Sequence, residues 1–185
     1  MRVDFGAKPW TYPQPVYIIG TYDEHGTPDA MNAAWGGISD DTQISFCLSA
    51  NHRTVANFGK TGAFTVHIAT ADQAVACDYV GIVSGDKEAR KMEKAGFHTV
   101  KAPHVNAPLI EELPMALECR VVSYDPESCR LVGEIVNVCA DERVLTDGKI
   151  DPAKLRPIVF DPVNAAYLAV GEPVARAFHD GAALR

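Results

Sequence analysis

The chain has 185 residues and a formal net charge of −7; 47% of its residues are hydrophobic and 22% are charged. This balance is ordinary for a globular protein, and the length suffices for a single domain over 1–185 that buries a core without disulfides. An acidic chain with no basic cluster is poorly suited to nucleic acid. Because neither a signal peptide nor an apolar run of membrane-spanning length is visible, we expect a cytoplasmic protein that does not contact a membrane.

Apolar and β-branched runs bounded by turn residues predict a strand-rich chain. The predicted strands cover residues 16–22, 27–35, 44–48, 64–68, 115–123 and 131–139. The turn DEHG at 23–26 should join the first two strands as a hairpin, and the turn DPES at 125–128 should join the last two.

Between strands 44–48 and 64–68, the chain carries a possible anion site at a helix start. Asn51 is a suitable N-cap, and Arg53 and Thr54 fall in the first turn of the short helix that follows. Free backbone N–H groups, the positive end of the helix dipole, a guanidinium and the hydroxyls of Ser49 and Thr54 would converge there. That combination suits a phosphate, although an ordinary capped helix with a solvated arginine gives the same pattern.

Further helices are inserted along the chain. Thr70 and Gln73 resemble a capping box in front of an apolar helical stripe. The stripe consists of Ala71, Ala74, Val75, Ala76 and Tyr79. Residues 86–95 predict a helix with a solvated, mixed-charge face, which Gly96 ends.

The C-terminal part predicts one helical turn at 152–155 and, from about 171 to 185, an arm over the surface. Many short strands with helices inserted rather than alternating favour a mainly β fold, a small antiparallel barrel, over a doubly wound parallel sheet. The GxGxxG dinucleotide motif and the Walker P-loop are both absent.

The cysteines and histidines give no metal-site pattern. The chain has five cysteines without a CxxC pair and six scattered histidines. We therefore expect reduced, mainly buried thiols and no metal site.

A series of segments carries a resemblance to a known family. In chain order they are PVYIIGTYDEHGTPDAMNAAWGG, ISFCLSANHRTVANFGKTGAFTV, SG followed by RKMEKAGF, APLIEELPMALECRV, LVGEIVNVCADERVL, GKIDPAKL and YLAVGEPVARAF. Their number and order resemble the flavin reductase-like, FMN-binding split-barrel proteins, and within them the flavoredoxin branch, over nearly the whole chain. The resemblance implies a Greek-key split β-barrel that forms a homodimer with one non-covalent FMN per subunit near the interface.

The resemblance also implies which residues hold the FMN. They are Asn32, Ala33, Ala34, Trp35, Cys47, Leu48, Ser49, Ala50, Arg53, Thr54, Ser84, Gly85, Lys91 and Tyr167. Backbone of 32–35 and 47–50 would lie against the isoalloxazine, since small residues let the backbone approach a flat ring. The phosphate would go to Arg53 and Thr54, and the segment with Ser84, Gly85 and Lys91 would close over the phosphate and ribityl side.

Several of these residues have an equally simple structural interpretation. Lys91 could be an ordinary surface lysine. The rings of Trp35 and Tyr167 could fill the core instead of flanking the flavin. His67, where the family commonly has Asn, fits a hydrogen-bonded strand histidine better than a catalytic one.

The second hairpin turn departs from the family, because relatives often carry a histidine where this chain has Ser128 or Cys129. A different electron donor or rate could follow from this change. Cys129 beside Arg130 could have a lowered thiol pKa, but an unreactive turn cysteine is the better interpretation.

No residue is predicted to be catalytic, because FMN carries the electron chemistry and the protein positions it. The hypothesis is an FMN-dependent oxidoreductase that takes electrons from NAD(P)H or a redox protein partner and passes them to an acceptor. The first alternative is an FMN-binding electron carrier with little reductase activity. A hydrolase or thiol enzyme unrelated to flavin has poor support, since there is no G-x-S-x-G elbow and no cysteine in a nucleophile signature.

Overall fold

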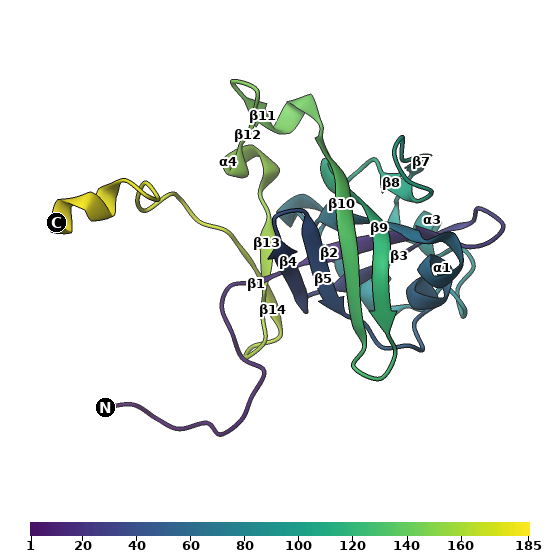
Figure 1. The fold of residues 1–185 in the computed structure, drawn as a ribbon, viewed down its shortest axis with the longest axis horizontal. Coiled ribbons are helices and arrows are strands. Elements are labelled where there is room, and N and C mark those ends of the chain that lie inside the picture. Colours follow the sequence, from purple (N-terminus) through teal and green to yellow (C-terminus); the bar gives the residue numbers. More distant parts are fainter.

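The computed structural model describes all 185 residues, and its main feature is a curled, seven-stranded antiparallel sheet (Figure 1). The strands in spatial order are β3 (Pro28–Ala33), β2 (Tyr17–Tyr22), β6 (Ala63–Ile68), β9 (Met115–Asp125), β10 (Arg130–Ala140), β5 (Gln43–Cys47) and β4 (Gly36–Asp40). β3 and β4 form the two edges of the sheet, yet only Ala34 and Trp35 separate them in the chain. The sheet must therefore curl until its edges approach each other, which makes it a half-barrel.

Three smaller sheets and four helices surround the half-barrel. The small sheets are β1 (Gln14–Pro15) with β13 (Ile158–Asp161) and β14 (Ala166–Ala169), β7 (Thr99–Lys101) with β8 (Pro108–Ile110), and β11 (Leu145–Thr146) with β12 (Lys149–Ile150). The helices are α1 (Arg53–Thr61), α2 (Ala74–Ile82), α3 (Lys91–Ala95) and α4 (Pro152–Leu155), with 3-10 turns at Ala71–Gln73, Glu142–Val144 and Asp180–Leu184. No helix is both long and apolar enough to cross a membrane.

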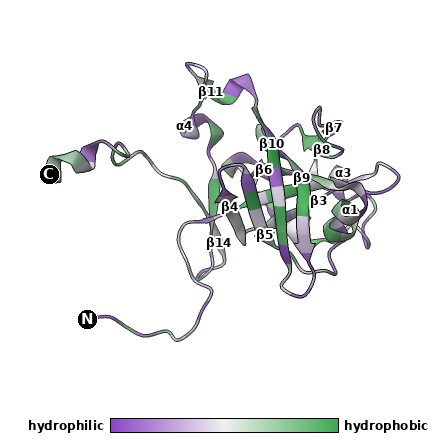
Figure 2. Ribbon diagram, in the orientation of Figure 1, coloured by the Kyte–Doolittle hydropathy of each residue, from purple (hydrophilic) through white to green (hydrophobic).

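Two apolar cores lie on opposite faces of the sheet. The core inside the curl contains Phe46, Phe58, Phe64 and Leu131 from β5, α1, β6 and β10. The second core packs α2 and α3 against the outer face of β2 and β3. Figure 2 shows the hydrophobic residues concentrated along the central strands. β3 contributes Ala33 to the inner core and Ala30 to the outer core, so this edge strand packs against both α1 and α2.

The glycine at 133 is required by the inner core. A β-carbon there would lie 2.3 Å from Cζ of Phe64, a distance no real contact allows. A register shift in the β9–β10 ladder falls at the same point, between Val132 and Gly133. The bulge bends the long hairpin around Phe64 and so helps the sheet to curl.

Both predicted hairpins are confirmed, as β2–β3 and β9–β10. The helix predicted over 86–95 begins only at Lys91, because residues 84–88 form turns in which Lys87 and Glu88 donate to the Ser84 carbonyl. Gly96 ends it in the left-handed conformation, as predicted.

Three finer predictions are wrong. Thr70 makes no side-chain cap bond. Val75 is 86% exposed, although the other four residues of the predicted stripe pack against the outer core with Cys77 and Val80. The thiols are all free, but only Cys77 and Cys119 are buried. The tail 171–185 is exposed throughout and leaves the body of the single chain (Figure 1).

Candidate functional site

A pocket of about 460 Å³ lies between β3, the start of α1 and the segment 80–91. This volume is within the range of small-molecule clefts. The lining residues are Asp29, Met31, Asn32, Asn51, His52, Arg53, Thr54, Val80, Gly81, Ile82, Val83, Ser84, Gly85, Asp86, Lys87 and Lys91. The pocket brings together three segments that are distant in the sequence.

The start of α1 offers unpaired backbone donors to this pocket. The His52 carbonyl accepts the N–H groups of both Val55 and Ala56, so the N–H groups of Arg53 and Thr54 precede the intrahelical ladder. The N-cap is His52, not Asn51, and no side chain caps the helix. No acidic residue lies in the first turn. This end of the helix therefore keeps its positive potential for a ligand.

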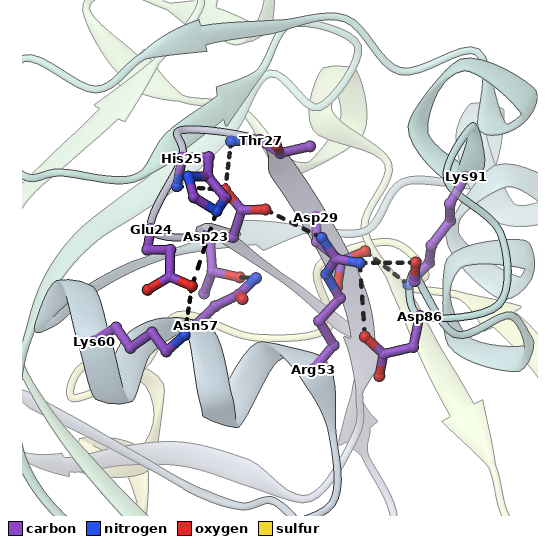
Figure 3. A network of polar contacts seen from close by, with 12 residues as sticks. Asp23, Glu24, His25, Thr27, Asp29, Arg53, Asn57, Lys60, Asp86 and Lys91 are labelled. Carbon is purple, nitrogen blue, oxygen red and sulfur yellow. Dashed lines mark hydrogen bonds and ion pairs between the residues drawn. The ribbon is translucent and has the colours of Figure 1, made fainter.

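Arg53 is held in place by groups from two loops (Figure 3). Its Nη1 donates to the Gly85 carbonyl at 2.8 Å, and its Nη2 lies 3.2 Å from Oδ2 of Asp23. Asp86 approaches Nη1 at 3.6 Å. The Nε atom is buried and has no hydrogen-bond partner. An unpaired guanidinium N–H is costly to bury, so an acceptor supplied by a ligand would satisfy it.

Lys91 is buried, which excludes the surface-lysine interpretation. Its Nζ lies 3.2 Å from Oδ1 of Asp29 and donates to the Ala30 carbonyl at 2.5 Å. Burial lowers the pKa of Lys91, and the Asp29 charge opposes that shift. Lys91 also corrects the expectation that the whole face 86–95 is solvated. It ties α3 to β3 beneath the pocket (Figure 3).

Glycines allow the 80–91 segment to approach β3 and α1 closely. A β-carbon at Gly85 would lie 2.8 Å from Oδ1 of Asp29 and 3.0 Å from Cδ of Arg53. A β-carbon at Gly81 would lie 2.8 Å from Cβ of Asn32. A side chain at either position would therefore push the 80–91 segment away from β3 and α1.

Comparison with known proteins identifies the family of this chain. Residues 10–160 match the family described as "Flavin reductase like domain". The chain belongs to this family. The flavoredoxin of Desulfovibrio vulgaris (Miyazaki F) is 37% identical, with a TM-score of 0.93 over 98% of this chain and 100% of that one. The flavoredoxin of Methanosarcina acetivorans is 25% identical, with a TM-score of 0.86 over 100% of this chain and 98% of that one.

The predicted split-barrel fold is likewise confirmed. A split-barrel domain protein of Shewanella frigidimarina superposes with a TM-score of 0.74 over 88% of this chain and 84% of that one, at 20% identity. At that identity the likeness concerns the fold alone.

In this flavin reductase-like chain, the pocket gathers six of the predicted site residues. They are Asn32, Arg53, Thr54, Ser84, Gly85 and Lys91. Tyr167 lies outside the pocket wall but bonds to Asn32 through its hydroxyl. Ala33 and Leu48 are buried in the inner core, and Ser49 and Ala50 are exposed beyond β5.

Trp35 lies on the outside of the flavin reductase-like domain, so it does not fill the core. It is 55% exposed and borders two shallow hollows beside the pocket. One hollow lies against Trp10 and Ala34, and the other against Cys47 and Arg130. Of the predicted ring-binding residues, only Ala34, Trp35 and Cys47 therefore border these hollows, which together we call the outer rim, whereas Asn32 and the phosphate residues line the pocket itself.

The acidic residues around the pocket were missed from the sequence. Asp23, Asp29 and Asp86 pair with Arg53 or Lys91. Each stands alone in its own segment, and nothing in the local pattern shows that it meets a cation far along the chain. His67 was interpreted correctly: it is fully buried, with Nε2 accepting from the Ile110 N–H at 2.9 Å and Nδ1 facing the Ile18 carbonyl at 3.2 Å.

Proposed function

We propose that this chain is an FMN-dependent oxidoreductase that passes electrons from NAD(P)H or a redox protein to an acceptor. The observation that carries the proposal is the anion-ready start of α1 in a flavin reductase-like chain. The N–H groups of Arg53 and Thr54 point out of the helix, and Arg53 Nε is buried without a partner. A phosphate oxygen is the acceptor that would satisfy these donors.

The residues that line the pocket suit the phosphate end of FMN. Arg53 and Thr54 would hold the phosphate, and the backbone of Ser84 and Gly85 would close over it. Arg53 already forms ion pairs with Asp23 and Asp86, so its attraction for a phosphate is weaker than that of an unpaired arginine. When bound, FMN supplies the hydride and electron-transfer chemistry. The protein orients it and tunes it with nearby dipoles.

The visible spectrum tests this proposal directly. Purified protein, reconstituted with FMN, should show flavin bands that bleach under anaerobic conditions with NADH or NADPH. Rapid bleaching by one nucleotide identifies the donor. Protein that stays colourless and does not retain FMN would refute the proposal.

A second candidate is an FMN-binding electron carrier with little reductase activity. The 37% identity to the flavoredoxin of Desulfovibrio vulgaris favours it. In that case FMN stays oxidised with both nucleotides, and only a reduced partner protein reduces it quickly. The same spectra separate the two functions.

We also propose a homodimer that covers the rim around Trp35. Trp35 and Ile38 are 55% and 65% exposed, and β4 leaves a sheet edge open beside them. Exposed apolar groups on an open edge strand are usually covered by a partner. Sedimentation at micromolar concentration should give twice the 20.0 kDa chain mass. A species of one chain mass would contradict the dimer.

A further inference from the structure

Asn32 of β3 uses both hydrogens of its side-chain amide inside the protein. Its Nδ2 donates to the Cys77 carbonyl at 3.1 Å and to the Tyr167 hydroxyl at 3.3 Å. An amide NH2 group has two hydrogens, so its donor capacity is complete. No group of the protein bonds to Oδ1, and that atom is not among the buried unpaired ones. Asn32 itself lines the pocket.

The neighbours of Asn32 fix which way its side-chain amide is turned. The Tyr167 hydroxyl donates to Oδ1 of Asp78 at 2.8 Å. An ionised carboxylate only accepts, so the single hydroxyl hydrogen is committed to Asp78 and the hydroxyl can only accept from Asn32. The Cys77 carbonyl likewise can only accept. A flipped amide would place Oδ1 against two acceptors, which fixes Nδ2 on this side.

The hydroxyl keeps its hydrogen at neutral pH. Burial, and then the bond to Asp78, raise the pKa of Tyr167 to about 12. We call the hydrogen-bonded series Asp78–Tyr167–Asn32 the relay. Its members come from α2, β14 and β3, so the relay forms only in the folded chain.

We propose that Asp78 and Tyr167 are positioning residues that present Asn32 Oδ1 to the pocket as the acceptor for a hydrogen-bond donor of the ligand. The inference rests on the proposed function, in which the ligand is FMN. Asn32 lies three residues beyond Asp29 along β3, a rise of about 10 Å in an extended strand. Asp29 borders the Arg53 end of the pocket, since both residues lie against Gly85. The donor is therefore on the neutral part of FMN, either a ribityl hydroxyl or the imide N–H of the ring.

A double-mutant cycle tests the relay. Asn32→Ala and Tyr167→Phe should each weaken FMN and riboflavin about 3- to 10-fold, the range of one neutral hydrogen bond. The double variant should bind no more weakly than Asn32→Ala alone, because Tyr167 acts only through Asn32. Tyr79→Phe is the matched control, since it removes a hydroxyl from the same apolar cluster and should leave affinity unchanged. Asp78→Ala removes the acceptor of the Tyr167 hydroxyl, so it should weaken flavin binding by the same factor as Tyr167→Phe.

Lumiflavin, which lacks the ribityl chain, identifies the donor. If Asn32→Ala leaves lumiflavin binding intact, the donor is a ribityl hydroxyl; if lumiflavin weakens equally, the donor is the imide N–H. Additive losses, or unchanged affinity in folded single variants, overturn the positioning role while the proposed function stands. A wild-type protein that binds no flavin overturns both.

Discussion

Lys91 and Asp29 form an ion pair at 3.2 Å in which each side chain is only 5% exposed. The pair joins α3 to the edge strand of the sheet in the wall of the candidate pocket. Two charges at this depth are tolerated because each has the other and because Lys91 also donates to the Ala30 carbonyl.

Removing one partner of this pair should be strongly destabilising. We expect Lys91→Met to lower the free energy of unfolding by about 3–5 kcal/mol, because Asp29 would be left buried and unpaired. Lys91→Met combined with Asp29→Asn should recover most of the loss. The control is Lys94→Met on the same helix, whose partner Glu88 is partly exposed; its loss of stability should be much smaller, because water screens an exposed ion pair. Urea unfolding measures all four proteins, and equal losses for the two lysines would contradict the prediction.

The second prediction concerns the phosphate of the flavin. The variant with Arg53→Ala and Thr54→Ala should bind FMN more weakly by about 2–4 kcal/mol, because a charge-assisted contact and a hydroxyl contact are lost. Riboflavin, which has no phosphate, should bind almost as before. Titration calorimetry with both flavins gives the comparison. Arg143→Ala removes an exposed arginine outside the pocket and serves as the control. Equal losses for the two flavins would show that the phosphate lies elsewhere.

The third prediction concerns stability against pH. Burial lowers the pKa of His67 to about 4 from its usual 6.5, so the unfolded chain takes up this proton at higher pH than the folded one. Above pH 6.5 both states are neutral and the residue contributes nothing. As pH falls from 6.5 towards 4, it should reduce the free energy of unfolding by up to about 3 kcal/mol. Protonation would also set an N–H against the Ile110 N–H.

The matching variant is His67→Gln, which removes the titrating ring. Urea unfolding at pH 7 and pH 4.5 should show a smaller difference in the variant than in the wild type. The slope against pH is the readout, so a lower absolute stability of the variant does not affect the test. An unchanged slope would mean that His67 titrates normally in the folded protein.

The fourth prediction orders the thiols by reactivity. Cys47 is exposed, whereas burial raises the pKa of both Cys77 and Cys119 to about 12. Because the thiolate is the reactive form, iodoacetamide at pH 8 should label Cys47 and leave the two buried thiols unmodified in dilute, flavin-free protein, where the proposed dimer has separated into single chains. Peptide mass spectrometry with and without denaturant measures this. Labelling of Cys77 at the rate of Cys47 in native protein would show that α2 opens readily.

Local signals in the sequence were sufficient to predict most strands and helices and the anion end of the site. Alternation and turn residues located both hairpins, and the Arg53–Thr54 pair at a helix start pointed to the anion end of the pocket. These features depend on neighbours within a few residues. The exact cap was missed, because Asn51 is the better cap by residue type, yet the helix begins one residue later, after His52, with no side-chain cap.

Local patterns in the chain therefore establish the strand-rich class and the helix start, and the resemblance adds the family. The tertiary structure alone decided that Lys91 is buried against Asp29 rather than solvated, and that Asp78, Tyr167 and Asn32 meet. The residues that meet are far apart in the chain: Asn32 and Tyr167, for example, are 135 positions apart. They also come from different elements of the fold. Such contacts depend on how the sheet curls and where the helices pack, and no local preference of the chain encodes those distances.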